Sequence, residues 1–132
     1  MRVRIALVLL VTFAGSMLLA AAQSGSALSY ARDVEPVFLA ECGDCHGAEK
    51  PKKGLDLSQG KGHAALVGRP SQEVADMLLV KAGDPAASYL WAKLQHTTSE
   101  GKGMPRTIFG AKKLAPEQLD LVERWISDGA LP

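Results

Sequence analysis

The feature that most constrains this chain is a five-residue motif, Cys42-Gly43-Asp44-Cys45-His46. It contains the only two cysteines of the chain, and a histidine directly follows the second. This spacing is typical of covalent c-type haem attachment, in which two thiols add to two vinyl groups and the imidazole binds the iron. Gly43 is expected to let the backbone turn tightly between the thioethers. The motif predicts one haem c, attached through Cys42 and Cys45, with His46 as the proximal iron ligand.

Three other kinds of site use the same residue types and remain alternatives. A thioredoxin-like redox pair would need alternating strands and helices, and the sequence pattern shows no such alternation. A structural zinc site needs four ligands, so His63 or His96 would have to join the motif. A disulfide between Cys42 and Cys45 would close a very short loop and stabilise the fold little.

The first 22 residues are expected to be a secretory signal peptide. Arg2 and Arg4 precede a nearly continuous apolar run, and Ala20-Ala21-Ala22 offers small residues for cleavage. A retained membrane anchor is the alternative, because residues 5–22 are at the short end of what spans a bilayer. A periplasmic or otherwise exported protein agrees with the motif, because c-type haem is attached outside the cytoplasm.

The rest of the chain is expected to form a short linker, residues 23–29, and a single domain, residues 30–132. A chain of 132 residues fits one domain. Lys and Arg total 15 against 14 Asp and Glu, which is too balanced to indicate nucleic-acid binding. Only 5% of the residues are aromatic, so a large apolar group supplied from outside would help to fill the core.

The domain is predicted to be small and all-α, with long connecting loops. A first helix is expected from Val34 to about Glu41, capped by Asp33. A second begins at Asp84-Pro85, and a third runs from Pro116 to Gly129. Two stripes at helical spacing should be buried: Val34, Val37, Phe38 and Cys42, and Leu119, Val122, Trp125 and Ile126. Residues 47–72 and 97–110 are expected to be loops that wrap a large flat cofactor, whereas the pattern of residues 74–80 does not decide between helix and strand.

The predicted distal iron ligand is Met104. It lies in Gly101-Lys102-Gly103-Met104-Pro105, where the glycines allow a close backbone approach to the ring and the proline fixes the loop. A thioether is a soft, neutral ligand that raises the reduction potential. A methionine packed under the loop is one alternative, and ligation by His96 is another. Met77 is expected in the core and His63 on the surface.

Several stretches make the chain resemble a class I cytochrome c, and most closely the small single-haem planctomycete-type cytochrome c domains. They are Asp33 to Val37, Cys42 to Gly47, Gly54-Leu55-Asp56-Leu57, Gly83-Asp84-Pro85, Ser88-Tyr89-Leu90, Met104-Pro105 and Trp125 to Ala130. The resemblance implies a small helical fold whose N- and C-terminal helices cross beside the haem. It implies thioether anchors at Cys42 and Cys45, with iron ligated by His46 and Met104. Arg106 departs from the Met-Pro-Pro of many relatives, and the loop of residues 47–70 leaves the carbonyl that orients His46 unassigned.

The resulting functional expectation is an exported carrier of single electrons, not an enzyme by itself. No separate substrate site or acid–base pair is evident in the sequence. The alternatives are a haem-based ligand sensor, or a small haem enzyme with an open distal site near His96. The sixth coordination position of the iron distinguishes them. Candidate walls of the haem pocket are Phe38, Trp91 and Trp125, although each would serve equally well as plain core.

Positive charge is expected to gather around the edge of the haem. Eight cations flank the motif or Met104: Lys50, Lys52, Lys53, Lys61, Lys102, Arg106, Lys112 and Lys113. Such a face would steer a redox protein with an acidic docking surface. After cleavage of the signal peptide no membrane contact is expected, and the chain would act as a monomer or as a subunit of a redox complex.

Overall fold

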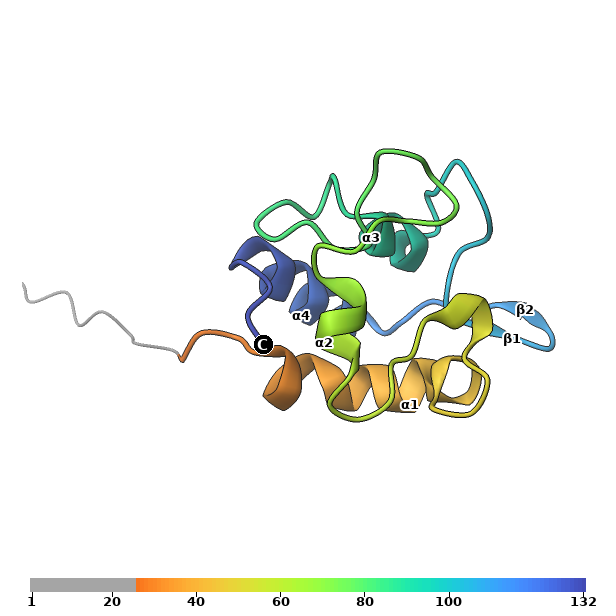
Figure 1. Ribbon diagram of the computed structural model, residues 1–132, viewed down its shortest axis with the longest axis horizontal. Coiled ribbons are helices and arrows are strands. Elements are labelled where there is room, and N and C mark those ends of the chain that lie inside the picture. The colour runs from red at the N-terminus through yellow and green to blue at the C-terminus, as the bar shows by residue number, and fades with distance from the viewer. Residues whose placement is uncertain (1–25) are drawn as a thin grey trace, which may run out of the picture.

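The structure is a computed structural model that describes residues 26–132. The predicted signal peptide therefore lies outside the described residues. The regular structure is helical apart from a small hairpin, which confirms the predicted helical class (Figure 1). In chain order the elements are the π-helical turn Tyr30–Val34, α1 Glu35–His46, the 3-10 turn Lys52–Gly54, α2 Gly62–Leu66, α3 Tyr89–Gln95, β1 Arg106–Thr107, β2 Gly110–Ala111 and α4 Pro116–Ser127.

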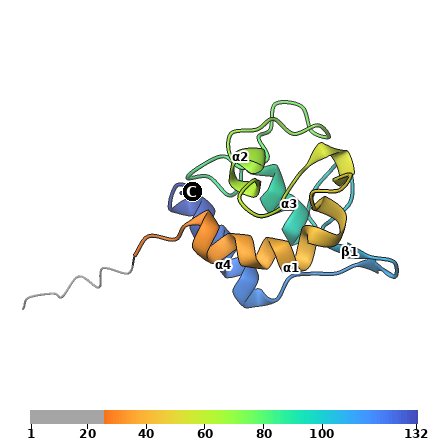
Figure 2. The ribbon, with the colours of Figure 1, turned by 60° about the horizontal axis from the view of Figure 1, so that its bottom comes forward.

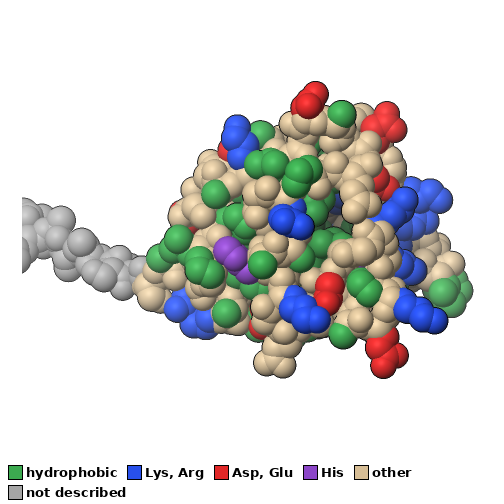
Figure 3. Space-filling model, in the orientation of Figure 1, with side chains coloured by type: hydrophobic (Ala, Val, Ile, Leu, Met, Phe, Trp, Pro, Cys, Tyr) green, Lys and Arg blue, Asp and Glu red, His purple; other side chains and the backbone are tan. Residues whose placement is uncertain are grey.

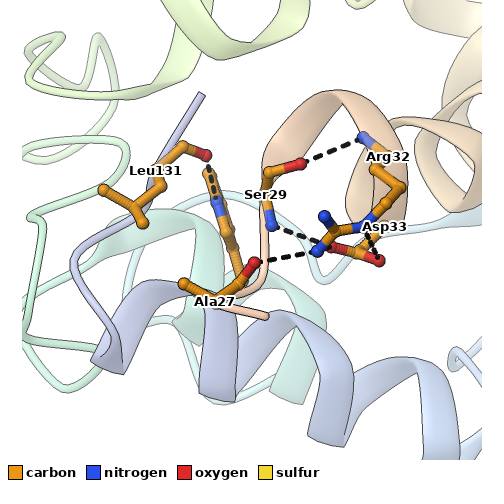
Figure 4. A network of polar contacts seen from close by, with 6 residues as sticks. Ala27, Ser29, Arg32, Asp33 and Leu131 are labelled. Carbon is orange, nitrogen blue, oxygen red and sulfur yellow. Dashed lines mark hydrogen bonds and ion pairs between the residues drawn. The ribbon is translucent and has the colours of Figure 1, made fainter. Parts of the chain in front are cut away.

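The N-terminal helix is longer at both ends than its sequence pattern predicted. The π-helical turn leads directly into α1, and Ser29 caps the combined helix by accepting from the N–H of Arg32 at 3.3 Å. Asp33 is not the cap. Its carboxylate instead reaches back one turn and accepts from the N–H of Ser29 at 2.8 Å (Figure 4). The helix ends at His46, and at the next residue, Gly47, a Cβ would lie 2.7 Å from the carbonyl oxygen of Gly43.

The middle of the chain is mostly loop, with short helical turns inside it. The predicted loop of residues 47–72 contains the 3-10 turn and α2. The second predicted helix starts later than expected, at Tyr89, because Asp84 caps a tight turn: its carboxylate accepts from the N–H of Ala87 at 3.1 Å. Leu78 forms isolated bridges with Pro70 and Ser88, so part of residues 74–80 is extended.

Helix α4 begins at Pro116 as predicted. Ala115 offers no side-chain acceptor, but its own N–H donates to the Gln118 side chain at 3.0 Å, which secures this end. The predicted stripe on α4 is confirmed: Val122, Trp125 and Ile126 are buried and Leu119 is half-buried.

The core lies where α4 crosses the N-terminal helix (Figure 2). Tyr30 packs against Trp125 with ring centroids 5.5 Å apart and against Phe38 at 6.0 Å. His63, predicted at the surface, is half-buried: its ring packs at the edge of this cluster and contacts the carbonyl of Ala130 at 2.8 Å. Within residues 26–132, every helix is too short or too polar to cross a bilayer.

Candidate functional site

The site is a cavity of about 1310 Å³ between the C-terminal half of α1, α3 and the loops that connect the helices. Protein interiors are close-packed and contain few voids larger than a water molecule. Cavities that hold ordinary small ligands measure about 300–1,000 Å³. A cavity of this size in so small a domain is therefore suited to a large bound group. Its apolar wall consists mainly of leucines: Leu55, Leu57, Leu66, Leu79, Leu90 and Leu94.

The structure places all four predicted site residues, Cys42, Cys45, His46 and Met104, on the wall of this one cavity. The first three lie on α1, where positions separated by three and four residues share one face of a helix. The expected tight turn at Gly43 is wrong, since the motif is helical throughout. A Cβ at Gly43 would have no atom within 4 Å, so this position does not require glycine.

His46 is oriented by the backbone of the following loop. Its Nδ1 lies 3.2 Å from the carbonyl oxygen of Leu55. A carbonyl only accepts, so Nδ1 carries the proton and Nε2 keeps a lone pair that can bind a metal. Burial lowers the pKa of the imidazole more than its contacts with the Leu55 and Lys52 backbone raise it. His46 is therefore neutral at neutral pH, the state that a metal ligand requires.

The sequence did not assign Leu55 this role, although Gly54-Leu55-Asp56-Leu57 was among the stretches that carry the family resemblance. The same segment also fixes the end of α1, because the N–H of Leu57 donates to the His46 carbonyl at 2.7 Å. The signal was present in the sequence as a motif. The role itself depends on how a loop folds back, and residue types do not show that.

Met104 is held through its backbone on both sides. Its N–H donates to the carbonyl of Lys93 at 2.9 Å, and its carbonyl accepts from Nε2 of His96 at 3.0 Å. The backbone of Met104 is thus tied to α3 and to the residue that ends it. The thioether belongs to a residue that lines the cavity, as the sequence predicted for a distal ligand.

The other residues considered as ligands lie elsewhere. His96 and Met77 are not part of the cavity wall. His63 and His96, which a zinc site would have needed, each contact a backbone carbonyl, those of Ala130 and Met104. Among the residues that the structure describes, no three His, Cys, Asp or Glu side chains gather as a metal site.

The two cysteines are free thiols in distinct surroundings. Burial, with a smaller effect of Glu41 and Cys45, raises the pKa of the Cys42 thiol to about 12. Redox-active pairs need the opposite, a thiol with a lowered pKa. The Lys52 ammonium lies against Cys45 at 3.2 Å. Cys42 therefore lacks the lowered pKa of an activated redox thiol, whereas Cys45 lies beside a cation.

The aromatic residues proposed as pocket walls do not line the cavity. Phe38 and Trp125 are fully buried in the helix crossing, and Trp91 packs half-buried against that core. Helical spacing shows that such residues face inward. It does not show which side of the interior they face, and here they build the core while the leucines line the cavity.

A buried cation on the cavity wall was not predicted. Lys93 forms an ion pair with Glu73 and lies over the Tyr89 ring, 4.9 Å from its centroid. The Tyr89 hydroxyl donates to the same carboxylate at 2.7 Å. Burial alone would lower the pKa of the Lys93 ammonium, but the contacts with Glu73 and Tyr89 outweigh it and raise that pKa.

The charge around the cavity is positive in excess. Three carboxylates line it, those of Glu41, Asp44 and Glu73. The six lining cations are Lys52, Lys53, Arg69, Lys93, Arg106 and Lys112. Four of these were among the eight predicted to surround the site; Arg69 and Lys93 were not.

The close approach of Gly103 to His96 gives a first testable prediction. A Cβ at Gly103 would lie 2.5 Å from Cγ and 2.9 Å from Cβ of His96. We expect Gly103→Ala to displace the imidazole from the Met104 carbonyl and to lower the stability by about 1–2 kcal/mol. Denaturant unfolding measures this, with Gly43→Ala as the control because its Cβ meets nothing within 4 Å. Equal stability of the two variants would contradict the prediction.

Comparison of the chain with protein-family models, with curated proteins and with solved structures gave no significant match. The function must therefore be argued from the motif and from the site itself.

Proposed function

We propose that the chain is an exported single-haem c-type cytochrome that carries single electrons between redox partners. One observation supports this most: a single large, leucine-lined cavity whose wall contains Cys42, Cys45, His46 and Met104. Two thiols, an imidazole and a thioether are the donor set of a covalently attached haem with histidine and methionine ligands. On this proposal the helical domain has a small cytochrome c fold, completed when haem fills the cavity.

The residues that line the cavity are of the types that a covalently bound haem requires. Cys42 and Cys45 would form the two thioether bonds, and Nε2 of His46 and the Met104 sulfur would bind the iron. When bound, the haem iron supplies a one-electron couple between the ferric and ferrous states. The Leu55 carbonyl holds the imidazole in one tautomer, and the contacts of Met104 with Lys93 and His96 keep its backbone in place.

These restraints suit electron transfer, because ligands held in place change little between oxidation states. The leucines would give a bound haem an apolar surrounding on one side, and an apolar surrounding with a methionine ligand favours the reduced form. The surplus of cations at the cavity would attract a redox protein with an acidic surface. On this proposal the chain supplies ligands, a leucine-lined pocket and a charged approach, and no substrate chemistry of its own.

The visible absorption spectrum of protein matured with a haem-attachment system tests the proposal. We expect a low-spin spectrum with a weak far-red sulfur-to-iron band in the ferric form. Met104→Ala should abolish that band. Met77→Ala is the matched control and should retain it, because Met77 is not part of the cavity wall.

Two results would contradict the electron-carrier proposal. One is a high-spin spectrum that shifts when carbon monoxide or cyanide is added, which would indicate an open sixth position and favour a sensor or a small haem enzyme. The other is a far-red band that survives Met104→Ala, which would assign the distal position to a different residue.

A further inference from the structure

The hairpin formed by β1 and β2 presents two large apolar side chains to solvent. Ile108 and Phe109 form its tip, and each is 93% exposed. The next most exposed large hydrophobic residues in the described part of the chain are Leu131 at 42% and Leu39 at 39%. Exposed apolar side chains that stand together commonly mark an interaction site.

The tip is held in shape and is not a frayed end. Thr107 and Gly110 are paired across the hairpin, and the Thr107 hydroxyl accepts from the N–H of Phe109 at 3.1 Å. Strands β1 and β2 project from the body of the molecule beside the C-terminal end of α1 (Figures 1 and 2). The two apolar side chains are therefore displayed on a convex, hydrogen-bonded turn.

The surroundings of this tip are uniformly basic in sequence. Residues 101–116 contain no Asp or Glu, and they contain Lys102, Arg106, Lys112 and Lys113. In the space-filling view, apolar side chains at the right-hand extremity have Lys and Arg side chains on either side (Figure 3). Lys112 is also paired with Glu41 at 2.6 Å, which fixes the base of the hairpin against α1.

We propose that this hairpin docks the protein on an anionic lipid surface. Ile108 and Phe109 would enter the boundary between headgroups and acyl chains, while the flanking cations contact the lipid phosphates. An apolar tip bordered by cations matches the layering of such a surface, and each cation near it contributes favourably to binding.

The area of the tip favours a membrane over a protein partner. A stable protein interface buries about 800 Å² on each side, whereas one aromatic side chain buries about 150–250 Å². A convex tip of two side chains reaches only a fraction of that area. A lipid surface, unlike a protein partner, needs no pocket complementary in shape to the two side chains.

Docking in this way would bring the cavity against the membrane. Arg106, Thr107 and Ile108 line the cavity, whereas Phe109 does not. Phe109 is thus a residue of the surface alone, and its replacement leaves the cavity wall unchanged. The inference does not rest on the proposed electron transfer, because lipid binding and the haem spectrum are measured separately.

Sedimentation with vesicles tests the proposal on the exported protein. We expect binding to phosphatidylglycerol mixed with phosphatidylcholine, little binding to phosphatidylcholine alone, and weakening by salt. Phe109→Ser should reduce the affinity about tenfold, and Ile108→Ser/Phe109→Ser should reduce it further. Leu39→Ser is the matched control and should bind as the unmodified protein does. All variants share one N-terminus, so a difference between them reports on the hairpin.

Three outcomes would overturn the inference. If the protein bound neither kind of vesicle, a membrane would be ruled out as the partner of the hairpin. Equal binding by Phe109→Ser and the unmodified protein would move the contact away from the hairpin. A concentration-dependent dimer that Phe109→Ser abolishes, with no vesicle binding, would assign the tip to a second copy of the chain.

Discussion

Replacing Cys42 and Cys45 together with serine is expected to abolish covalent haem attachment. Both thiols belong to the same face of α1 and line the same cavity, and serine cannot form a thioether. After denaturation the haem should remain with the unmodified polypeptide and separate entirely from the double variant. Haem staining of a denaturing gel, together with the mass of the intact chain, measures this. Each single variant should keep one bond and therefore keep the haem.

The matched control lies between the two cysteines. Gly43→Ala changes the motif at a helical position where a Cβ meets nothing within 4 Å, so attachment should proceed as in the unmodified protein. Haem that stays bound to the denatured double variant would show that the thiols are not the anchors. An unmodified protein that releases its haem on denaturation would contradict the c-type proposal as a whole.

Truncating Trp125 is expected to have the largest effect on stability. Its side chain is fully buried where α4 crosses the N-terminal helix, it packs against Tyr30, and its indole N–H donates to the Leu131 carbonyl at 2.9 Å. Removing a buried tryptophan costs about 3–5 kcal/mol. Domains of this kind have only about 5–15 kcal/mol in total. Trp125→Ala should therefore be barely folded, as measured by denaturant unfolding followed by far-ultraviolet circular dichroism.

Leu131→Ala is the control for Trp125→Ala at the C-terminal contact. It keeps the backbone carbonyl that accepts from both Trp125 and Tyr30 and removes a side chain that is 42% exposed. We expect it to cost less than about 1 kcal/mol. A Trp125→Ala variant as stable as Leu131→Ala would show that the helix crossing is not the core of the fold.

The sequence predicts the start and the buried face of a helix correctly where neighbouring residues alone decide them. Pro116 starts α4, and the spacing of Val122, Trp125 and Ile126 identifies its buried face, because helical period and the fixed backbone of proline act within a few residues. The predicted start of α3 is too early, because Asp84-Pro85 is as favourable in a tight turn as at the start of a helix. The predicted N-terminal helix begins too late, because its cap, Ser29, precedes the stretch with clear apolar spacing.

The hairpin of β1 and β2 shows the same division between local sequence and tertiary structure. Its composition, with Ile108 and Phe109 between basic residues and no acidic ones, can be read from the sequence. The sequence does not show that the two side chains project into solvent, because their exposure depends on whether another element covers the turn.

By itself, the sequence determined the chemistry of the site: two thiols and a histidine at one fixed spacing, and a methionine in a glycine- and proline-bounded loop. These chemical groups belong to the residue types themselves and need no fold to be identified. The tertiary structure alone decided that Leu55 orients His46, that His96 holds the loop of Met104, and that leucines line the cavity while Phe38 and Trp125 build the core. These relations join segments distant in the chain, and only packing brings such segments together.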